Sequence, residues 1–129
     1  MMNLVVLIGR LVADPELRYT QAGVPVASFR LAVDRPFTNE QGERETDFLP
    51  VIAWRNLAEI IAHNLTKGRL VAVQGRIQTR SFQAQDGTTR WVTEVVADNV
   101  RFLDWPREQQ QTEAAADDGG FEGGDSVPF

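Results

Sequence analysis

The sequence of 129 residues contains no cysteine, one histidine and one lysine. Without cysteine the chain forms no disulfide and offers no thiolate to zinc, which fits a reducing compartment. The single histidine, His63, has no second histidine or carboxylate at metal-ligand spacing. No apolar run approaches the roughly 20 residues that span a bilayer, and no export signal appears. These absences predict a soluble, intracellular protein with no metal site and no membrane partner.

The same shortages argue against catalysis. One histidine, no cysteine and no carboxylate pair at a recognisable spacing supply no nucleophile, general base or metal cage. The sequence therefore predicts a binding protein rather than an enzyme.

Charge is divided unevenly along the chain. Residues 1–106 hold 12 basic and 12 acidic residues, whereas residues 107–129 hold one arginine and six acids and so carry the whole net charge of -5. A neutral domain lacks the positive excess typical of nucleic-acid binders, so binding of this kind must use local patches. Nearly all the basic residues are arginine, which stacks on bases as well as pairing with phosphates.

Residues 47–54, Asp-Phe-Leu-Pro-Val-Ile-Ala-Trp, form the strand around which the rest is organised. With a period of two, Val51 and Ala53 fall on one face, and Phe48 and Trp54 fall on the other, about 20 Å apart at roughly 3.3 Å per residue. If the small aliphatic face points inward, the aromatics form an outward platform for unpaired bases. The alternative is that a neighbouring subunit or helix buries them.

Further strands are predicted at residues 4–11, 24–35, 70–82 and 93–103, with a short extension at 17–20 and a polar loop at 36–46 that holds Phe37. We expect residues 4–8 to be buried on both faces and Gly9 to mark a bulge or bend. A helix follows residue 54, with Asn56 and Glu59 resembling a capping box. Its expected buried stripe is Leu57, Ile60, Ile61 and Leu65, and its expected stop is Lys67-Gly68.

Arginine and aromatic residues alternate on the strand at 70–82. Arg76, Arg80 and Phe82 share one face, and Asp86-Gly87 predicts a hairpin turn that returns through Arg90 and Trp91. Such a hairpin is suited to wrapping a strand of nucleic acid.

The order strand, strand, strand, helix, strand, strand predicts an all-β fold with one helix. It is the order of a five-stranded OB-fold barrel, with the helix between the third and fourth strands. The domain is expected at residues 1–106 and a disordered acidic tail at 107–129. The tail ends in Val127-Pro128-Phe129, an apolar tip typical of a peptide ligand, although it could instead serve only solubility.

Residues 3–20, 54–68, 75–82 and 93–97, together with the Pro-Phe end, resemble the bacterial single-stranded DNA-binding protein family. The resemblance implies a cytoplasmic homotetramer that binds single-stranded DNA in replication, recombination and repair, with no cofactor. It places the base-stacking positions on Phe37, Phe48, Trp54 and Phe82, several of which are often Trp in the family. It also implies that the tip, with Asp125, Val127, Pro128 and Phe129, recruits genome-maintenance proteins, although Ser126 interrupts the usual run of acids.

The sequence pattern adds candidate contacts to the DNA backbone, which are Arg10, Arg30, Arg35, Arg76, Arg80 and Arg90. An RNA-binding module or a structural OB-fold subunit of a larger assembly remains the alternative function.

Overall fold

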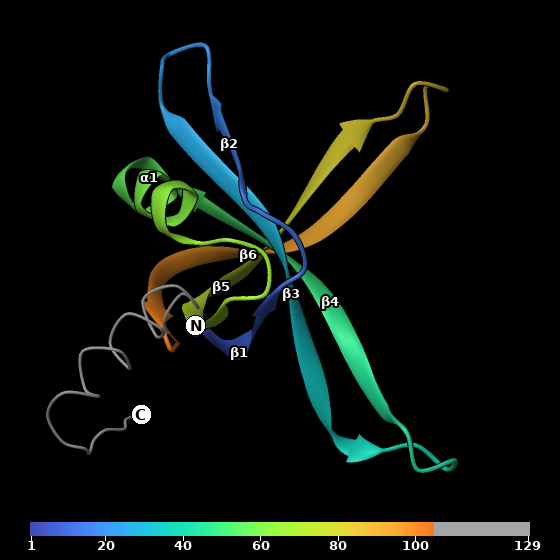
Figure 1. Ribbon diagram of the computed structural model, residues 1–129. Coiled ribbons are helices and arrows are strands. Elements are labelled where there is room, and N and C mark those ends of the chain that lie inside the picture. The colour runs from blue at the N-terminus through green and yellow to red at the C-terminus, as the bar shows by residue number, and fades with distance from the viewer. Residues whose placement is uncertain (105–129) are drawn as a thin grey trace, which may run out of the picture.

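The computed structural model describes residues 1–104. The expected tail, its tip and the domain boundary at residue 106 lie outside these residues. The described chain contains one helix and six strands (Figure 1). They are β1 (Val5–Leu11), β2 (Glu16–Tyr19), β3 (Pro25–Thr38), β4 (Arg44–Trp54), α1 (Arg55–Asn64), β5 (Leu70–Gln83) and β6 (Thr89–Phe102).

Five strands close into a mixed barrel, which confirms the predicted OB-fold class. Neighbours follow the order β1, β5, β6, β4 and β3, and β1 pairs with β3 to complete the circle. All pairs are antiparallel except β4 with β6. The short β2 pairs with β3 and is not one of the five barrel strands. In chain order the barrel strands are β1, β3, β4, β5 and β6, so α1 lies between the third and the fourth, as predicted.

The barrel interior is filled by the aliphatic side chains whose alternation predicted it. Ala27, Leu31, Val51 and Ala53 are buried, as is Phe29. The inward parity of β3 and β4 is thus confirmed, and the opposite parity of both strands faces outward. That division places Phe48 and Trp54 outside the barrel.

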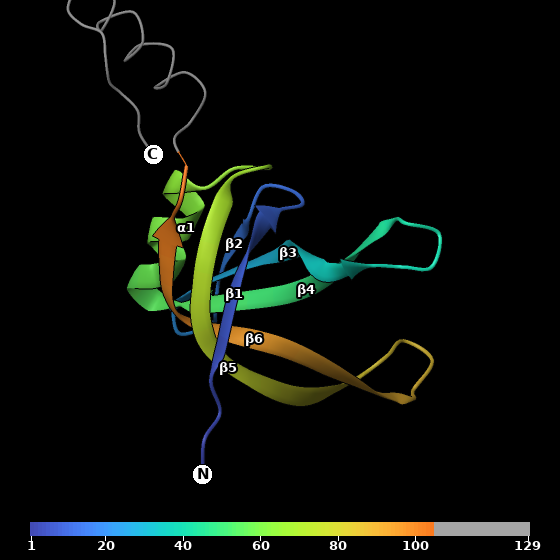
Figure 2. The ribbon, with the colours of Figure 1, turned by 90° about the horizontal axis from the view of Figure 1, so that it is seen from below.

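Two long hairpins extend beyond the barrel as arms, one formed by β3 and β4 and the other by β5 and β6. They diverge in Figure 1, and Figure 2 shows both leaving the barrel on the side away from α1. The expected loop at 36–46 is therefore wrong, because β3 continues to Thr38 and β4 begins at Arg44. Both arm strands are polar and exposed, so no alternation marks them, and the register shifts between Asp34 and Thr38.

Two glycines permit backbones to approach closely where the barrel closes. A Cβ on Gly9 would overlap the carbonyl oxygen of Ala32, and a Cβ on Gly75 would overlap that of Val96. Gly9 keeps regular pairing with Val71 at the point where β1 passes from β5 toward β3. It therefore marks the barrel corner, as predicted, without a bulge in β1.

The start of α1 differs from the sequence prediction. Asn56 lies inside the helix, Trp54 occupies the N-cap position, and no side chain caps it. The predicted capping box is therefore wrong, because the helix begins directly from the last strand residue. Arg55 makes the junction with a φ of 64°.

The rest of the helix also departs from prediction at two positions. Ile61, Leu65 and Ala58 are buried, but Ile60 is exposed, because the core stripe of α1 is narrower than the apolar pattern suggested. The helix ends at Asn64 with Leu65 as its C-cap. Gly68 lies in the following turn, where its N–H donates to the Leu11 carbonyl oxygen at 2.9 Å. His63 is exposed, as expected.

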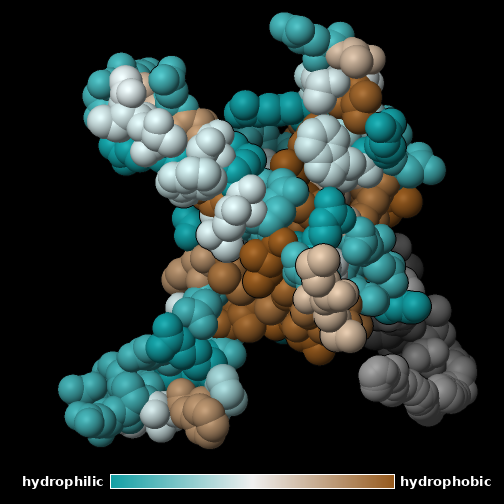
Figure 3. Space-filling model, turned by 180° about the vertical axis from the view of Figure 1, so that it is seen from behind, coloured by the Kyte–Doolittle hydropathy of each residue, from teal (hydrophilic) through white to brown (hydrophobic). Residues whose placement is uncertain are grey.

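The outer side of β1 is apolar and uncovered in the single chain. Leu4, Val6 and Ile8 are each more than half exposed, so the prediction that residues 4–8 are buried on both faces is wrong for one chain alone. Figure 3 shows hydrophobic residues concentrated on the central body, whereas the arms are mainly hydrophilic. The apolar surface therefore belongs to the barrel, not to the arms.

Candidate nucleic-acid interface

One continuous outer face crosses the barrel from β2 to β5. The register sets Ser28 opposite Ile52 and Ala32 opposite Phe48, while Ile52 pairs with Val96 across the parallel strands. Because paired residues point to the same side of a sheet, the outward side chains of these strands share one surface. On β5 and β6 the same face carries Arg76, Gln78, Arg80 and Phe82, opposite Val96, Glu94, Val92 and Arg90 respectively.

The four predicted stacking residues are all on the surface, and three share this face. Phe48, Trp54 and Phe82 are 51%, 41% and 45% exposed, and Phe37 on the β3–β4 arm is 79% exposed. Within residues 1–104, therefore, nothing buries the aromatic platform. Exposed rings on a curved sheet are suited to stacking against flat, apolar groups.

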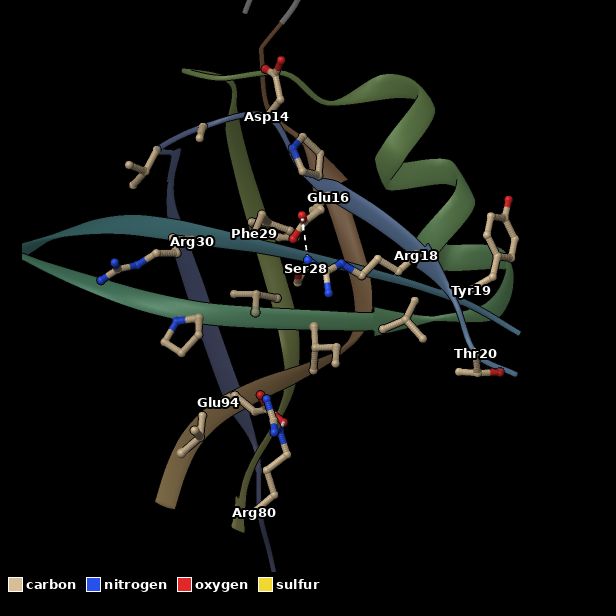
Figure 4. Close-up of a pocket in the computed structure, with 18 residues that line it drawn as sticks. Asp14, Glu16, Arg18, Tyr19, Thr20, Ser28, Phe29, Arg30, Arg80 and Glu94 are labelled. Atoms are coloured by element: carbon tan, nitrogen blue, oxygen red, sulfur yellow. Dashed lines mark hydrogen bonds and ion pairs between the residues drawn. The ribbon is translucent and has the colours of Figure 1, made fainter. Parts of the chain in front are cut away.

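An open groove of about 820 Å³ lies on the outer face. Figure 4 shows Arg18 of β2 and Arg80 of β5 on either side of β3 and β4, with Arg30 of β3 farther along the groove. Two of these cations have acidic partners, since Arg18 lies 3.0 Å from Glu16 and Arg80 lies 3.0 Å from Glu94. Arg30 has no acidic partner among residues 1–104.

Glu94 is a buried carboxylate at the floor of this groove. Its Oε2 accepts hydrogen bonds from Gln78 Nε2 at 2.8 Å and from Arg80 Nε at 3.0 Å. The bond through Nε fixes the guanidinium of Arg80, while half of that side chain stays exposed. A carboxylate that binds only Nε leaves the terminal nitrogens to contact an anion.

The other predicted backbone contacts lie outside the groove and are also paired. Arg10 reaches the Gly68 carbonyl oxygen at 2.9 Å and Asp104 at 3.4 Å. Arg76 lies 3.9 Å from Asp98, and Arg90 lies 3.7 Å from Asp86. Exposed pairs of this kind are weak, so a phosphate could replace the carboxylate at little cost.

Arg35 is held more firmly than these residues. It donates to both carboxylate oxygens of Asp47, at 3.1 Å and 3.3 Å from Nε, and to Glu45 at 2.7 Å from Nη1. The hydrogen bond from Arg35 lowers the pKa of Asp47, and the two acids raise the pKa of Arg35. Its assignment as a backbone contact stays a prediction, and a phosphate would have to compete with two carboxylates for it.

No cluster of three metal-ligating side chains is present among residues 1–104. In the same part of the chain, no helix is long and apolar enough to cross a membrane. Among residues 1–104, the outer face carries aromatic rings, guanidinium groups and an open groove.

Comparison with known proteins gives one consistent result. Residues 2–103 match the single-strand binding protein family. The chain belongs to this family. It is similar to the single-stranded DNA-binding protein of Caldanaerobacter subterraneus subsp. tengcongensis, at 60% identity over 104 residues that cover 81% of this chain and 69% of that protein.

Two further relatives carry the same description. The protein of Oceanobacillus iheyensis is 59% identical over 104 residues, which cover 81% of this chain and 65% of that protein. The protein of Clostridium tetani is 55% identical over 109 residues, which cover 84% and 74%. The matched residues thus span about two thirds to three quarters of these relatives. Membership of the single-strand binding protein family confirms the resemblance drawn from the sequence and the prediction that the chain is not an enzyme.

Two surface arginines, Arg18 and Arg55, were not among the DNA contacts predicted from the sequence. Arg18 was not assigned because β2 resembles only a short extension, yet it pairs with β3 and carries Arg18 into the groove. Arg55 was not assigned because no sequence signal marks its backbone conformation. The alternating pattern of β2 is a sequence signal that could have identified Arg18, whereas only the structure identifies Arg55.

Proposed function

We propose that this chain binds single-stranded DNA without sequence preference, through the outer face of β3, β4, β6 and β5. The observation that supports this most is the surface row of Phe48, Trp54 and Phe82, with Arg30 and Arg80 on the same face. Every base has a π-face, so stacking on these rings is tolerant of sequence, and arginines contact the connecting phosphates.

Stacking favours single strands over duplex. Bases in a duplex are already stacked and paired, so they offer no free face to Phe48 or Trp54. The charge of the groove supports the same conclusion, since Arg18 and Arg80 are partly neutralised by Glu16 and Glu94. A groove of this kind would attract a duplex only weakly through phosphates, and stacking must supply much of the affinity.

A competition experiment tests this proposal. Labelled oligo-dT bound to the full chain is challenged with unlabelled oligo-dT, oligo-U and duplex DNA at one stated salt concentration. The proposal predicts efficient displacement by oligo-dT and weak displacement by duplex. Equal or better displacement by oligo-U would favour the RNA-binding alternative, and no binding of any strand would favour a purely structural OB module.

We further propose that the chain acts as a homotetramer. Val6 and Ile8 of β1 and Leu4 just before it are exposed, and Ile8 pairs with Ala72 on the neighbouring β5. Contiguous apolar surface of this kind marks an interface between subunits. Sedimentation equilibrium at micromolar concentration should give four copies of the 14.4 kDa chain, with Val6→Glu lowering the mass; a monomer mass for the unaltered chain would contradict the proposal.

The tip of the chain completes the proposal. Asp125 and Val127-Pro128-Phe129 are proposed to dock genome-maintenance proteins, because the acids of residues 107–129 suit a basic pocket and the apolar residues suit an apolar pocket beside it. Deleting residues 125–129 should abolish capture of such proteins while oligo-dT affinity is kept or slightly raised. Unchanged capture would leave solubility as the role of the tail.

A further inference from the structure

Arg55 has an unusual backbone conformation. It is the only residue other than glycine with a positive φ among residues 1–104, at 64°. A Cβ makes this left-handed conformation unfavourable, whereas glycine adopts it freely. Strain of this kind concentrates at functional sites, where the surrounding structure holds it in place. An arginine at this position therefore implies a role that glycine would not fill.

Arg55 directly follows the end of the aromatic platform. Trp54 is the last residue of β4, with extended backbone angles of φ -124° and ψ 149°, and α1 begins with Arg55. The left-handed residue produces the abrupt turn from strand to helix. It also places a cation one residue from a proposed stacking ring, so a phosphate joined to a base on Trp54 lies within reach of its long side chain.

The surroundings of Arg55 leave its charge accessible. The residue is exposed and takes part in no ion pair or side-chain hydrogen bond within the described part of the chain. It lines a small open cavity of about 310 Å³ between the start of α1 and the turn from β2 to β3. The other lining residues are Gly23, Val24, Pro25, Asn56 and Glu59.

Arg55 differs from Arg18, Arg76 and Arg80 in having no carboxylate partner among residues 1–104. Arg18 and Arg76 each have a carboxylate partner that a phosphate must replace, and the buried Glu94 partly neutralises the charge of Arg80. Arg55 requires no such exchange, even though Glu59 lines the same cavity. A cation without a partner contributes its full charge to binding a phosphate.

We propose that Arg55 contacts a DNA phosphate at the Trp54 end of the binding face, and that the chain retains a strained arginine there for this contact. The inference rests on the proposed function, since it assumes that single-stranded DNA occupies the face. If the conformation served only the turn, glycine would form it with less strain. Arg55 is thus expected to trade stability for affinity.

Three variants of the full chain test this inference, which are Arg55→Gly, Arg55→Asn and Arg55→Lys. Thermal melting is measured without DNA, and oligo-dT affinity is measured across a salt series. Arg55→Gly should melt at the same or a higher temperature, yet bind about 3- to 10-fold more weakly. Its slope of log affinity against log salt should fall by about 0.7 for each chain that contacts the strand.

The other two variants separate charge from backbone freedom. Arg55→Lys keeps the charge and should keep the salt slope of the unaltered protein. Arg55→Asn tolerates the left-handed conformation without glycine's flexibility, and it should lose the slope as Arg55→Gly does. Agreement of the two neutral variants assigns the effect to charge.

Several results would overturn the inference. A salt slope in Arg55→Gly equal to that of the unaltered protein would show that no phosphate is contacted, and weaker binding with that unchanged slope would assign Arg55 to positioning Trp54. A lower melting temperature in Arg55→Gly would refute the trade of stability for affinity. Failure of the unaltered protein to bind oligo-dT would refute the proposed function itself, which keeps the two failures distinct.

Discussion

The guanidinium carbon of Arg30 lies 5.8 Å from the centre of the Phe48 ring. The two residues are diagonal neighbours on paired strands, because Arg30 is opposite Pro50 and Phe48 is opposite Ala32. The contact is a cation–π interaction, and it joins the arginine without an acidic partner in the groove to a ring of the platform. A base stacked on Phe48 would therefore meet a ring whose neighbour already carries positive charge.

This relationship predicts coupling between the two side chains in DNA binding. Phe48→Ala should weaken oligo-dT binding by about 1–3 kcal/mol through loss of stacking. Arg30→Ala should weaken it as well, and the double variant should lose less than the sum of the two single losses, by at least about 0.5 kcal/mol. A double-mutant cycle on oligo-dT affinity measures this, and strict additivity would show that the two residues act independently.

Arg76 and Arg80 are expected to contribute through charge. Each phosphate that they neutralise contributes about 0.7 to the slope of log affinity against log salt, so replacing both with Ala should flatten that slope. Glu94→Gln is the matched control, because it removes the carboxylate charge that competes for Arg80 while keeping an oxygen acceptor. That variant should bind oligo-dT more tightly, and a double-Ala variant with the slope of the unaltered protein would place both arginines off the DNA path.

The pair of Asp47 and Arg35 predicts a dependence of stability on pH. The pKa of Asp47 is lowered in the folded chain by its hydrogen bond with Arg35, so the pair stabilises the fold above the unfolded pKa, about 3.9. That contribution is lost as the pH falls through the folded pKa. Thermal melts between pH 7 and pH 3 should show a smaller acid-induced decrease in Asp47→Asn than in the unaltered protein.

Asp86→Asn tests the same linkage at a second carboxyl and should also show a smaller acid-induced decrease. Hydrogen bonds from the Thr88 hydroxyl and backbone lower the pKa of Asp86 as well, but its turn is remote in sequence from the β3–β4 arm. If Asp47→Asn and the unaltered protein lose melting temperature equally on acidification, the pair does not stabilise the fold.

Gly75 is expected to be essential to barrel closure. A Cβ at this position would overlap the Val96 carbonyl oxygen, which belongs to the backbone and has little freedom to move. Gly75→Ala should therefore destabilise the fold by about 3 kcal/mol. Gly87→Asn is the matched control, because Gly87 has a φ of 87° and open space around it, and Asn tolerates that conformation. Chemical denaturation should show a change of under about 0.5 kcal/mol for the control, and equal losses would contradict the close approach.

The sequence predicted the barrel well because its signals are local. Alternating Ala27, Phe29 and Leu31 allow only one inward face, and Asp86-Gly87 allows only a tight hairpin. The same alternation on β4 predicted that Phe48 and Trp54 lie outside the barrel if the small aliphatic face points inward. These features depend on neighbours in the chain, which a pattern can show.

The features that the sequence did not predict depend on distant residues. The pairing of Arg80 with Glu94 joins two strands through their register, and no pattern within either strand indicates it. The left-handed conformation of Arg55 depends on how α1 packs after β4, which the neighbouring residues do not indicate. The local sequence predicts a capping box at Asn56 instead. The β3–β4 arm was predicted as a loop because exposure on both faces removes the alternation on which strand prediction depends.

Fluorescence from Trp54 alone tests the central proposal most directly. In a chain carrying Trp91→Phe and Trp105→Phe, Trp54 is the remaining tryptophan, and it is 41% exposed on the proposed binding face. Titration with oligo-dT, followed in parallel by the anisotropy of labelled DNA, should quench this fluorescence in step with binding. Binding seen by anisotropy while Trp54 fluorescence stays unchanged would contradict the account, because the DNA would then occupy another surface.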